Sequence, residues 1–364
     1  MVNKLVLENL KHRPVRTLLS TLAIGLGVTM MLTLVGLSEG MLEDQKRRSK
    51  GVGADILIRP PGTSVIGLSS APINEKLLSF VAGIPEVELA TGTVVHPIGG
   101  VSTVTGIDYD TFVAMGGGFR YLAGGPFRGD LEVVIDQYYA QQHHLKVGNT
   151  FELMNKQWKV AGIVEPGKLA RIFVPIHLLQ ELTGNTGKLT VIYVKLKDAS
   201  RTDAVIEKLR QPLPDYKIYS MEEFISQFSV GNLPELQTFM SVVITLAVIF
   251  GFLVVFLAMY TAVLERTREI GIMKALGASP GYVLGILVRE TAMLAILGTL
   301  AGILLSFGTR AMVMNLIPGS LIQAIVPAWW PKAGAFTLVG ALLGVLYPAI
   351  RAAKQDALES LSYE

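Results

Sequence analysis

The sequence predicts an α-helical membrane protein with four transmembrane helices, plus a mixed α/β extracytoplasmic domain inserted between the first and second helices. Composition is the first observation behind this fold class: 51% of the 364 residues are hydrophobic, 17% are charged, and the mean hydropathy is +0.48. A soluble globular chain carries about 25% charged residues. The other two observations are four long uncharged apolar stretches and, between the first two of them, a segment in which strand and helix patterns alternate.

The four apolar stretches are long enough to cross a bilayer, because a helix rising about 1.5 Å per residue needs about 20 residues to span about 30 Å of hydrocarbon. A fifth uncharged run is interrupted by asparagine, glutamine, glycine and proline residues. We predict an outer loop or re-entrant hairpin there, at 310–332, with Trp329 and Trp330 at the membrane interface. The expected transmembrane helices are residues 17–38, 236–264 (long enough to include a stalk), 291–309 and 333–350.

Basic residues predict the orientation. They precede the first span, lie between the second and third, and follow the fourth, and such positive flanks stay in the cytoplasm. We therefore expect a multi-pass protein of the cell (inner) membrane with both termini inside and residues 39–235 outside. The first apolar run exceeds the roughly 7–15 residues of a signal peptide, which predicts a retained anchor. The cytoplasmic parts are then an amphipathic helix at 1–16 that lies on membrane lipid, a loop at 265–290 and a tail at 351–364.

The extracytoplasmic segment is predicted to contain a β-α-β unit near each of its ends. The first unit has strands at 54–59 and 86–95 around a helix capped by Asn74. The second has strands at 190–196 and 216–219 around a helix at 200–209. We expect two small lobes formed by these ends, with the centre as an insertion whose strands lie at 101–107, 132–135, 150–153, 158–164 and 171–174.

No catalytic, metal or cofactor site is predicted in this chain. Cysteine is absent, which excludes thiol catalysis and Cys-ligated metals, and the five histidines form no H-E-x-x-H motif. Residues 162–168 match G-x-x-x-x-G-K, but Leu169 stands where a magnesium-binding hydroxyl belongs and Pro166 removes a backbone N–H, so we expect a turn between strands. A net charge of +3 is too weak to indicate nucleic-acid binding.

The predicted membrane helices have uncharged cores, which argues against an ion-driven carrier, because such carriers need ionisable groups within the membrane. Two G-x-x-x-G motifs occur instead, at Gly298 and Gly302 in the third helix and at Gly340 and Gly344 in the fourth. Small residues at this spacing let helix backbones approach closely. Each pair could pack within one chain or between two copies.

The loop after the second span is the most informative segment. A helix through it would pair Glu265 with Arg268 and Arg266 with Glu269. Ile272, Met273 and Leu276 would form an apolar face on this helix. Gly277 is expected to end the helix, and Ser279 with Pro280 to begin the next. This short helix is either an elbow that meets lipid headgroups or a lever on which a cytoplasmic partner pushes.

This loop also carries a family resemblance. Its sequence at 265–278, ERTREIGIMKALGA, resembles the signature of the MacB/FtsX/LolC-like ABC transporter permeases. Residues 8–27 resemble the first helix of that family and 348–361 its end, while 129–167 and 173–180 resemble its periplasmic core domain. The motifs occur in the family's order and span nearly the whole chain.

The resemblance implies a non-enzymatic permease subunit that dimerises, as a homodimer or a close heterodimer, and recruits a separate ABC ATPase that holds ATP and Mg. It implies mechanotransmission, in which ATPase closure moves the helices and reshapes the outer domain to export or extract a substrate that the sequence does not name. A periplasmic adaptor is a further partner in the family, although the outer domain here is shorter than in the macrolide exporters. The coupling surface carried over from the family is Glu265, Arg266, Arg268, Glu269, Gly271, Lys274 and Gly277.

Two alternatives stay open at this stage. A signalling relative would use the same lever to regulate a cell-wall hydrolase or a sensor kinase. A membrane enzyme or channel would have no ATPase partner.

Overall fold

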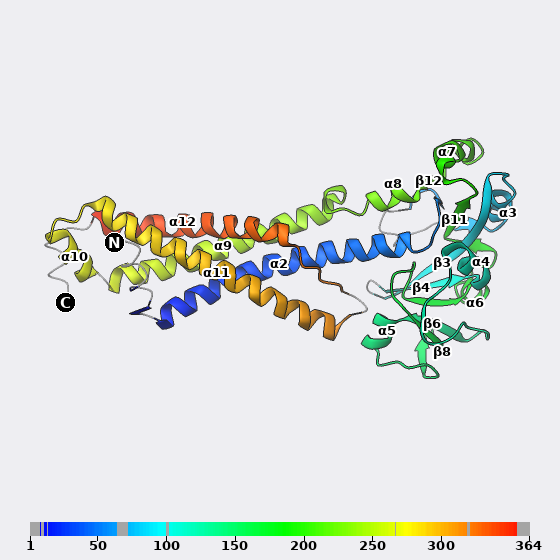
Figure 1. Ribbon diagram of the computed structural model, residues 1–364, viewed down its shortest axis with the longest axis horizontal. Helices are drawn as coiled ribbons and strands as arrows, with labels where there is room; N and C mark the ends of the chain where they lie inside the picture. Colours follow the sequence, from blue (N-terminus) through cyan, green and yellow to red (C-terminus); the bar gives the residue numbers. More distant parts are fainter. Residues whose placement is uncertain are drawn as a thin grey trace. The chain divides into compact units, whose positions relative to one another are not determined.

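The computed structural model describes residues 8, 11–12, 14–63, 72–99, 102–265, 267–318 and 321–354, except the side chains of Val230, Arg268 and Glu269 (Figure 1). The chain divides into two compact units. One, the membrane unit, comprises residues 1–39, 234–312 and 323–364; the other, the α/β unit, comprises 40–233 and 313–322. Most of the predicted helix at 1–16 and of the tail at 351–364 lies outside the described residues.

Among the described residues, four helices have the length and composition to cross a membrane, as the sequence predicts. All four extend beyond the expected spans, two of them by well over one turn at an end. The first continues past residue 38, and the third starts well before residue 291 and continues past 309, so the expected outer loop is partly helical. The charged residues after Glu39 sustain the first helix because Asp44 pairs with Arg47 and Arg48 one turn later. The four helices are α2 (Pro14–Lys50), α9 (Pro234–Glu265), α11 (Pro280–Leu316) and α12 (Trp330–Lys354), the last preceded by η3 (Pro327–Trp329).

The α/β unit is built on one ten-stranded sheet of order β12-β1-β11-β3-β4-β9-β6-β8-β5, with β7 paired to β8. All the strands expected from the sequence are present, and β5 in this sheet, like the separate short strands β2 and β10, is additional. The strands are β1 (Ile56–Arg59), β3 (Val87–Gly99), β4 (Ser102–Ile107), β5 (Tyr121–Gly124), β6 (Glu132–Asp136), β7 (Thr150–Leu153), β8 (Lys156–Val164), β9 (Ile172–Pro175), β11 (Val191–Leu196) and β12 (Lys217–Ser220), and a separate pair is formed by β2 (Ile73–Asn74) and β10 (Lys188–Leu189).

Short helices connect these strands. The helices expected after Asn74 and at 200–209 are present as α3 and α7, and Asn74 Oδ1 accepts a hydrogen bond from the Lys76 N–H at 3.0 Å. The helices of this unit are α3 (Lys76–Ala82), α4 (Tyr109–Gly116), α5 (Gln137–Gln142), α6 (Ile176–Leu182), α7 (Thr202–Arg210) and α8 (Met221–Ser226), with the 3-10 turns η1 (Ala199–Arg201) and η2 (Val230–Asn232).

The two predicted β-α-β units do not form separate lobes. Strands β1 and β3 both lie antiparallel to β11, and β11 and β12 both lie antiparallel to β1. Strand β11 therefore lies between the two strands of the first unit, and β1 lies between the two strands of the second. The two units interleave in one half of the sheet, an arrangement known as a split β-α-β fold. The centre of the domain is inserted between β3 and β11, and it continues the same sheet through the antiparallel β3–β4 pair. One aliphatic core around Trp158, which is fully buried, serves both halves.

Candidate functional site

The candidate site is the segment between the second and third membrane helices, which contains α10 (Thr267–Ala275). Gly277 ends this helix with φ +96°, its N–H donating to the Lys274 carbonyl at 3.0 Å while the Ala278 N–H donates to the Met273 carbonyl at 2.9 Å. This is a Schellman ending, which requires a residue that tolerates positive φ. Ser279 Oγ then accepts from the Tyr282 N–H at 3.2 Å at the start of α11. The helix end and start predicted around Gly277 and Pro280 are confirmed.

One side of α10 faces the helices of the membrane unit. Ile270 and Gly271 are buried, and Met273 packs against the core formed by α9, α11 and α12. Lys274 Nζ donates to the Ala353 carbonyl at 2.9 Å, in the last turn of α12, where unpaired carbonyls attract cations. Lys274, carried over from the family as part of a coupling surface, thus fastens α10 to α12.

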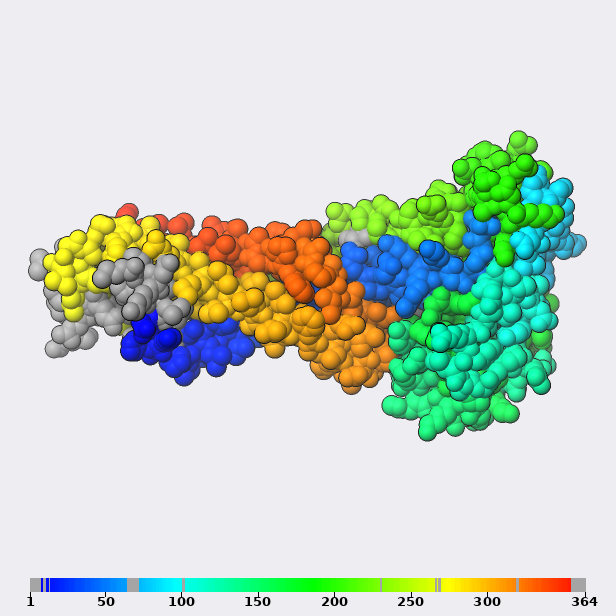
Figure 2. All heavy atoms as spheres, in the orientation of Figure 1, coloured from blue at the N-terminus to red at the C-terminus, as the bar shows by residue number. Residues whose placement is uncertain are grey.

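The opposite side of α10 is apolar and exposed. Leu276 is 84% exposed and Ile272, one turn earlier, is 45% exposed. The expected apolar face therefore divides, with Met273 inside and the other two residues outside. Figure 2 shows the yellow atoms of this segment at the surface of the membrane unit. Leu276 and Ile272, one turn apart, thus give this segment a small exposed apolar surface.

The expected charge pairs of this loop are only partly described. Arg266 and the side chains of Arg268 and Glu269 lie outside the described residues, as do their pairings. The Glu265 side chain is half exposed, and one of its oxygens lies 3.8 Å from a guanidinium nitrogen of Arg16.

Arg16 connects the start of α2 to two other membrane helices. It donates to Glu290 Oε1 at 2.9 Å, and Glu290 in α11 is fully buried. Together with Glu265 at the end of α9, these residues form a three-helix charge cluster, called here the Arg16 cluster. Sequence reasoning counted Arg16 among the basic residues that precede the first span and that belong to the predicted amphipathic helix. The available signal for this cluster was that all three charges lie at the ends of apolar stretches.

The four motif glycines lie at two helix contacts within the chain. A Cβ added at Gly302 would lie 2.7 Å from the Gly25 carbonyl oxygen in α2, and one at Gly298 would lie 2.5 Å from Ile24 Cγ2. In α12, a Cβ at Gly344 would lie 2.7 Å from the Phe252 carbonyl oxygen in α9, and at Gly340 the nearest atom is the Val248 oxygen at 3.3 Å. Gly298, Gly302 and Gly344 thus leave no room for a side chain.

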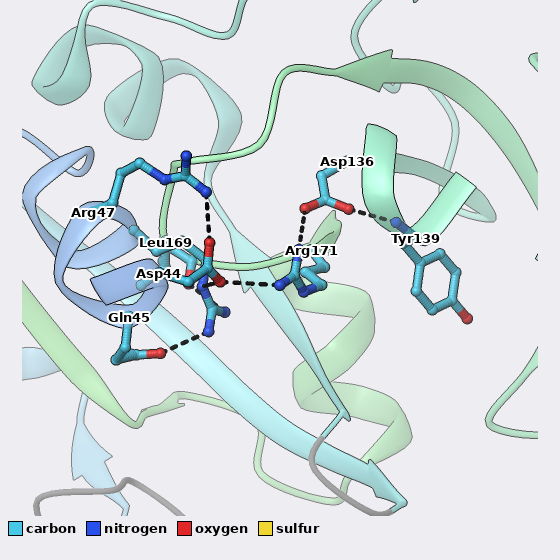
Figure 3. A network of polar contacts seen from close by, with 8 residues as sticks. Asp44, Gln45, Arg47, Asp136, Tyr139, Leu169 and Arg171 are labelled. Carbon is cyan, nitrogen blue, oxygen red and sulfur yellow. Dashed lines mark hydrogen bonds and ion pairs between the residues drawn. The ribbon is translucent and has the colours of Figure 1, made fainter. Parts of the chain in front are cut away.

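The other end of α2 lies in the α/β unit and carries a second charged network, called here the Arg171 cluster (Figure 3). Arg171 donates to Asp44 Oδ2 at 3.0 Å and to Asp136 Oδ2 at 2.9 Å. Asp44 also binds Arg47 at 2.7 Å and Arg48 at 3.0 Å. Asp136 caps α5 by accepting from the Tyr139 N–H at 2.8 Å. Burial raises the pKa of Asp136, while the Arg171 guanidinium opposes that shift.

The partial phosphate motif takes part in packing. Lys168 Nζ donates to the Gly116 carbonyl at the end of α4, and the Leu169 N–H donates to the Arg48 carbonyl at 2.9 Å. His143 stacks against Tyr139, and His177 lies 3.2 Å from Asp130. Among the residues that the structure describes, no three His, Asp or Glu side chains are grouped as metal ligands.

Two parts of the chain match domains of known protein families. Residues 17–211 match the MacB-like periplasmic core domain, and residues 241–357 match the FtsX-like permease C-terminal domain. The chain is 25% identical to the macrolide export ATP-binding/permease protein MacB of Escherichia coli, over 99% of this chain but only 60% of that protein. It is also 25% identical to the ABC transporter permease YknZ of Bacillus subtilis, over 99% of this chain and 98% of YknZ.

Two solved structures also resemble this chain. The periplasmic region of MacB from Actinobacillus actinomycetemcomitans matches with a TM-score of 0.38 and 14% identity, covering 48% of this chain and 92% of that structure. The extracellular domain of YknZ from Gram-positive bacteria matches with a TM-score of 0.36 and 16% identity, covering 46% of this chain and 99% of that structure.

Proposed function

We propose a function on the premise that this chain belongs to the family of MacB/FtsX-type ABC transporter permeases. We propose that it couples ATP hydrolysis by a separate ATPase subunit to movement of its extracytoplasmic domain, for export or extraction of a substrate. ATP and Mg would be held by that partner subunit. Two permease copies and two ATPase copies would form the working assembly, with both permease termini in the cytoplasm.

The observation that carries this proposal is the division of α10 into two sides. The exposed Leu276 and Ile272 offer an apolar contact for a soluble partner. The opposite side is fixed to α12 through Lys274 and to the membrane-unit core through Ile270 and Met273. A push on the exposed side would therefore reach the membrane helices instead of bending a loose loop.

Helix α2 supports the same mechanism at the other end of the path. It is one unbroken helix whose first turn belongs to the Arg16 cluster and whose last turns belong to the Arg171 cluster. Because α2 is one continuous helix with buried ion pairs near each end, we expect displacement of its start to be transmitted along the helix to its last turns.

A copurification experiment tests the proposed coupling. The tagged full chain is purified in mild detergent with its ABC ATPase, and Mg-dependent, vanadate-sensitive ATP hydrolysis is measured. We expect Leu276→Asp to reduce the bound ATPase at least tenfold, because a charge on this apolar contact must be desolvated. Leu131→Asp, the same change at an exposed leucine of the α/β unit, is the control and should have no effect. Unchanged ATPase binding by Leu276→Asp would overturn the assignment of α10.

Cysteine labelling tests the orientation. Because the chain has no cysteine, Lys146→Cys and Ser279→Cys each introduce a single exposed thiol. We expect a membrane-impermeant maleimide to label Lys146→Cys in intact cells and to label Ser279→Cys only after permeabilisation. The reverse pattern would contradict the orientation.

A further inference from the structure

Arg59, the last residue of β1, is buried, and no hydrogen bond joins it to any residue that the structure describes. It is 6% exposed, and its Nε is fully enclosed with no acceptor. Among the described residues, no Asp or Glu forms an ion pair with it, and the two carboxylates of α8, Glu222 and Glu223, are exposed to solvent. Burial lowers the pKa of Arg59, yet a guanidinium stays protonated. A buried cation without a counter-charge is costly, so an anion beside Arg59 would stabilise it, and none of the described residues supplies one.

The strand register places Arg59 among hydrogen-bond donors. Ile56 and Ile58 face the aliphatic core, so Arg59 and Leu57 lie on the opposite face of the sheet. Lys217 of β12 pairs directly with Arg59. Tyr193 and Tyr219 pair with Leu57 from the two neighbouring strands, on the same face as Arg59.

A further donor lies in the same row. Ile192 of β11 pairs with Ile58, so the next residue along β11, Val191, lies opposite Arg59. Val191 pairs on its other side with Thr93 of β3, so Arg59, Val191 and Thr93 lie side by side across three strands. Thr93 is fully buried and its Oγ1 has no partner. Burial raises the pKa of Tyr193, which keeps that hydroxyl protonated. Arginine, lysine and protonated tyrosine present N–H and O–H groups, and among the described residues no carboxylate forms an ion pair with Arg59 or Lys217 on this face.

Aromatic rings lie beside the Arg59 guanidinium. The Arg59 guanidinium carbon lies 5.7 Å from the centroid of the Phe224 ring in α8. Phe224 contacts the Phe228 ring edge-on at 5.0 Å and the Tyr219 ring at 6.4 Å. These rings stabilise a cation only in part, and they add an apolar surface beside the donors.

We propose that Arg59 anchors a binding site for a small organic acid, whose carboxylate meets the guanidinium and whose apolar body lies against Phe224. A guanidinium presents a planar pair of N–H groups that matches the two oxygens of a carboxylate. β12 is the outermost strand of the sheet, so the acid approaches Arg59 at a sheet edge, past the exposed Lys217. This site is independent of the coupling proposed for α10.

Benzoate is a suitable probe because it joins a carboxylate to an aromatic ring, and benzamide is its neutral counterpart. The full chain in detergent is unfolded by heat at constant ionic strength with either compound or with inorganic phosphate. We expect benzoate, at several times its dissociation constant, to raise the unfolding midpoint of the α/β unit by about 2–4 °C. Benzamide and phosphate should raise it by less than a quarter of that shift.

Arg59→Met tests the residue itself. We expect this variant to unfold at or above the wild-type temperature without ligand, because an uncompensated buried charge is gone, and to lose the response to benzoate. Arg201→Met, at an exposed arginine of the same unit, should keep the wild-type response. No benzoate shift in the wild type, an equal shift in Arg59→Met, or an equal shift with benzamide or phosphate would overturn the proposal.

Discussion

The two ends of α2 are both held by buried charges, but the two clusters differ in their surroundings: the Arg16 cluster joins three helices of the membrane unit, whereas the Arg171 cluster lies in the α/β unit. In the Arg16 cluster, one arginine lies between two glutamates, 2.9 Å from the fully buried Glu290 and 3.8 Å from Glu265. In the Arg171 cluster, Asp44 has three arginine partners, and Asp136 has Arg171 and a backbone N–H.

This difference teaches which end of α2 is more sensitive to a single substitution. Asp44 in the Arg171 cluster keeps Arg47 and Arg48 when Arg171 is removed. Removing Arg16 breaks its 2.9 Å contact with the fully buried Glu290, between apolar membrane helices where little water can solvate the carboxylate. We therefore expect the Arg16 cluster to respond more strongly than the Arg171 cluster.

Arg16→Met should have the largest effect. Removing the guanidinium beside Glu290 is expected to destabilise the full chain by about 3–5 kcal/mol, as for other broken buried pairs. Thermal unfolding in detergent measures this loss, and Arg16→Met combined with Glu290→Gln should restore a large part of it. A loss under about 1 kcal/mol for the single variant would contradict the predicted sensitivity.

Arg171→Met should have a smaller effect, about 2–3 kcal/mol, because Asp44 keeps Arg47 and Arg48, and Asp136 keeps the Tyr139 N–H. Hydrogen exchange of residues 40–50 and of β9 measures the local free energy of opening. Arg201→Met is the matched surface control and should stay within about 0.5 kcal/mol of the wild type. A larger loss for Arg171→Met than for Arg16→Met would reverse the comparison.

Gly302→Ala sharpens the comparison by testing the part of α2 between its charged ends. The new methyl would meet the Gly25 carbonyl oxygen at 2.7 Å and Val28 Cβ at 2.5 Å, so we expect a loss of about 1–3 kcal/mol. Gly308→Ala, in the same helix, has open space around its Cβ and should be neutral or stabilising by up to about 1 kcal/mol. Equal unfolding midpoints for the two variants would contradict close packing at Gly302.

The exposed pair of Lys208 and Glu86 provides the smallest effect. The hydrogen bond from Lys208 at 2.9 Å holds the pKa of Glu86 below its usual value. A carboxylate with a lowered pKa stabilises the fold above its unfolded-state pKa, and this contribution disappears as the pH falls through the folded-state pKa. Lys208→Met should therefore make unfolding slightly less dependent on pH between about pH 3 and 5. Indistinguishable pH profiles would show that solvent screens this pair fully.

The sequence predicted most of the elements but not their lengths or partners. The strands at 54–59 and 190–196 were recognisable because their apolar residues are bounded by turn residues, and Gly277 was recognisable as a helix end. The extension of α2 to Lys50 was missed, because a search for uncharged stretches stops at Glu39 whereas a helix continues wherever its backbone stays paired. The single half-sheet was missed because the pattern does not specify which strand fills a gap.

The candidate site shows the same limit. The family signature located the loop, yet it marked charged residues, and the structure shows that Lys274 faces inward and that Leu276 is the most exposed apolar side chain of the segment. Leu276 belonged to the predicted apolar face, and nothing in the spacing alone distinguished it from Met273.

By itself, the sequence determined the membrane class, the four spanning helices and the inserted α/β domain, because hydropathy and periodicity are local properties of the chain. Only the tertiary structure decided that Arg16 meets Glu290, that Arg171 joins Asp44 to Asp136, and that the Nε of Arg59 is buried with no acceptor among the described residues. These contacts connect residues that are distant in the sequence, and their energies depend on burial, which is known only once the helices and strands have packed.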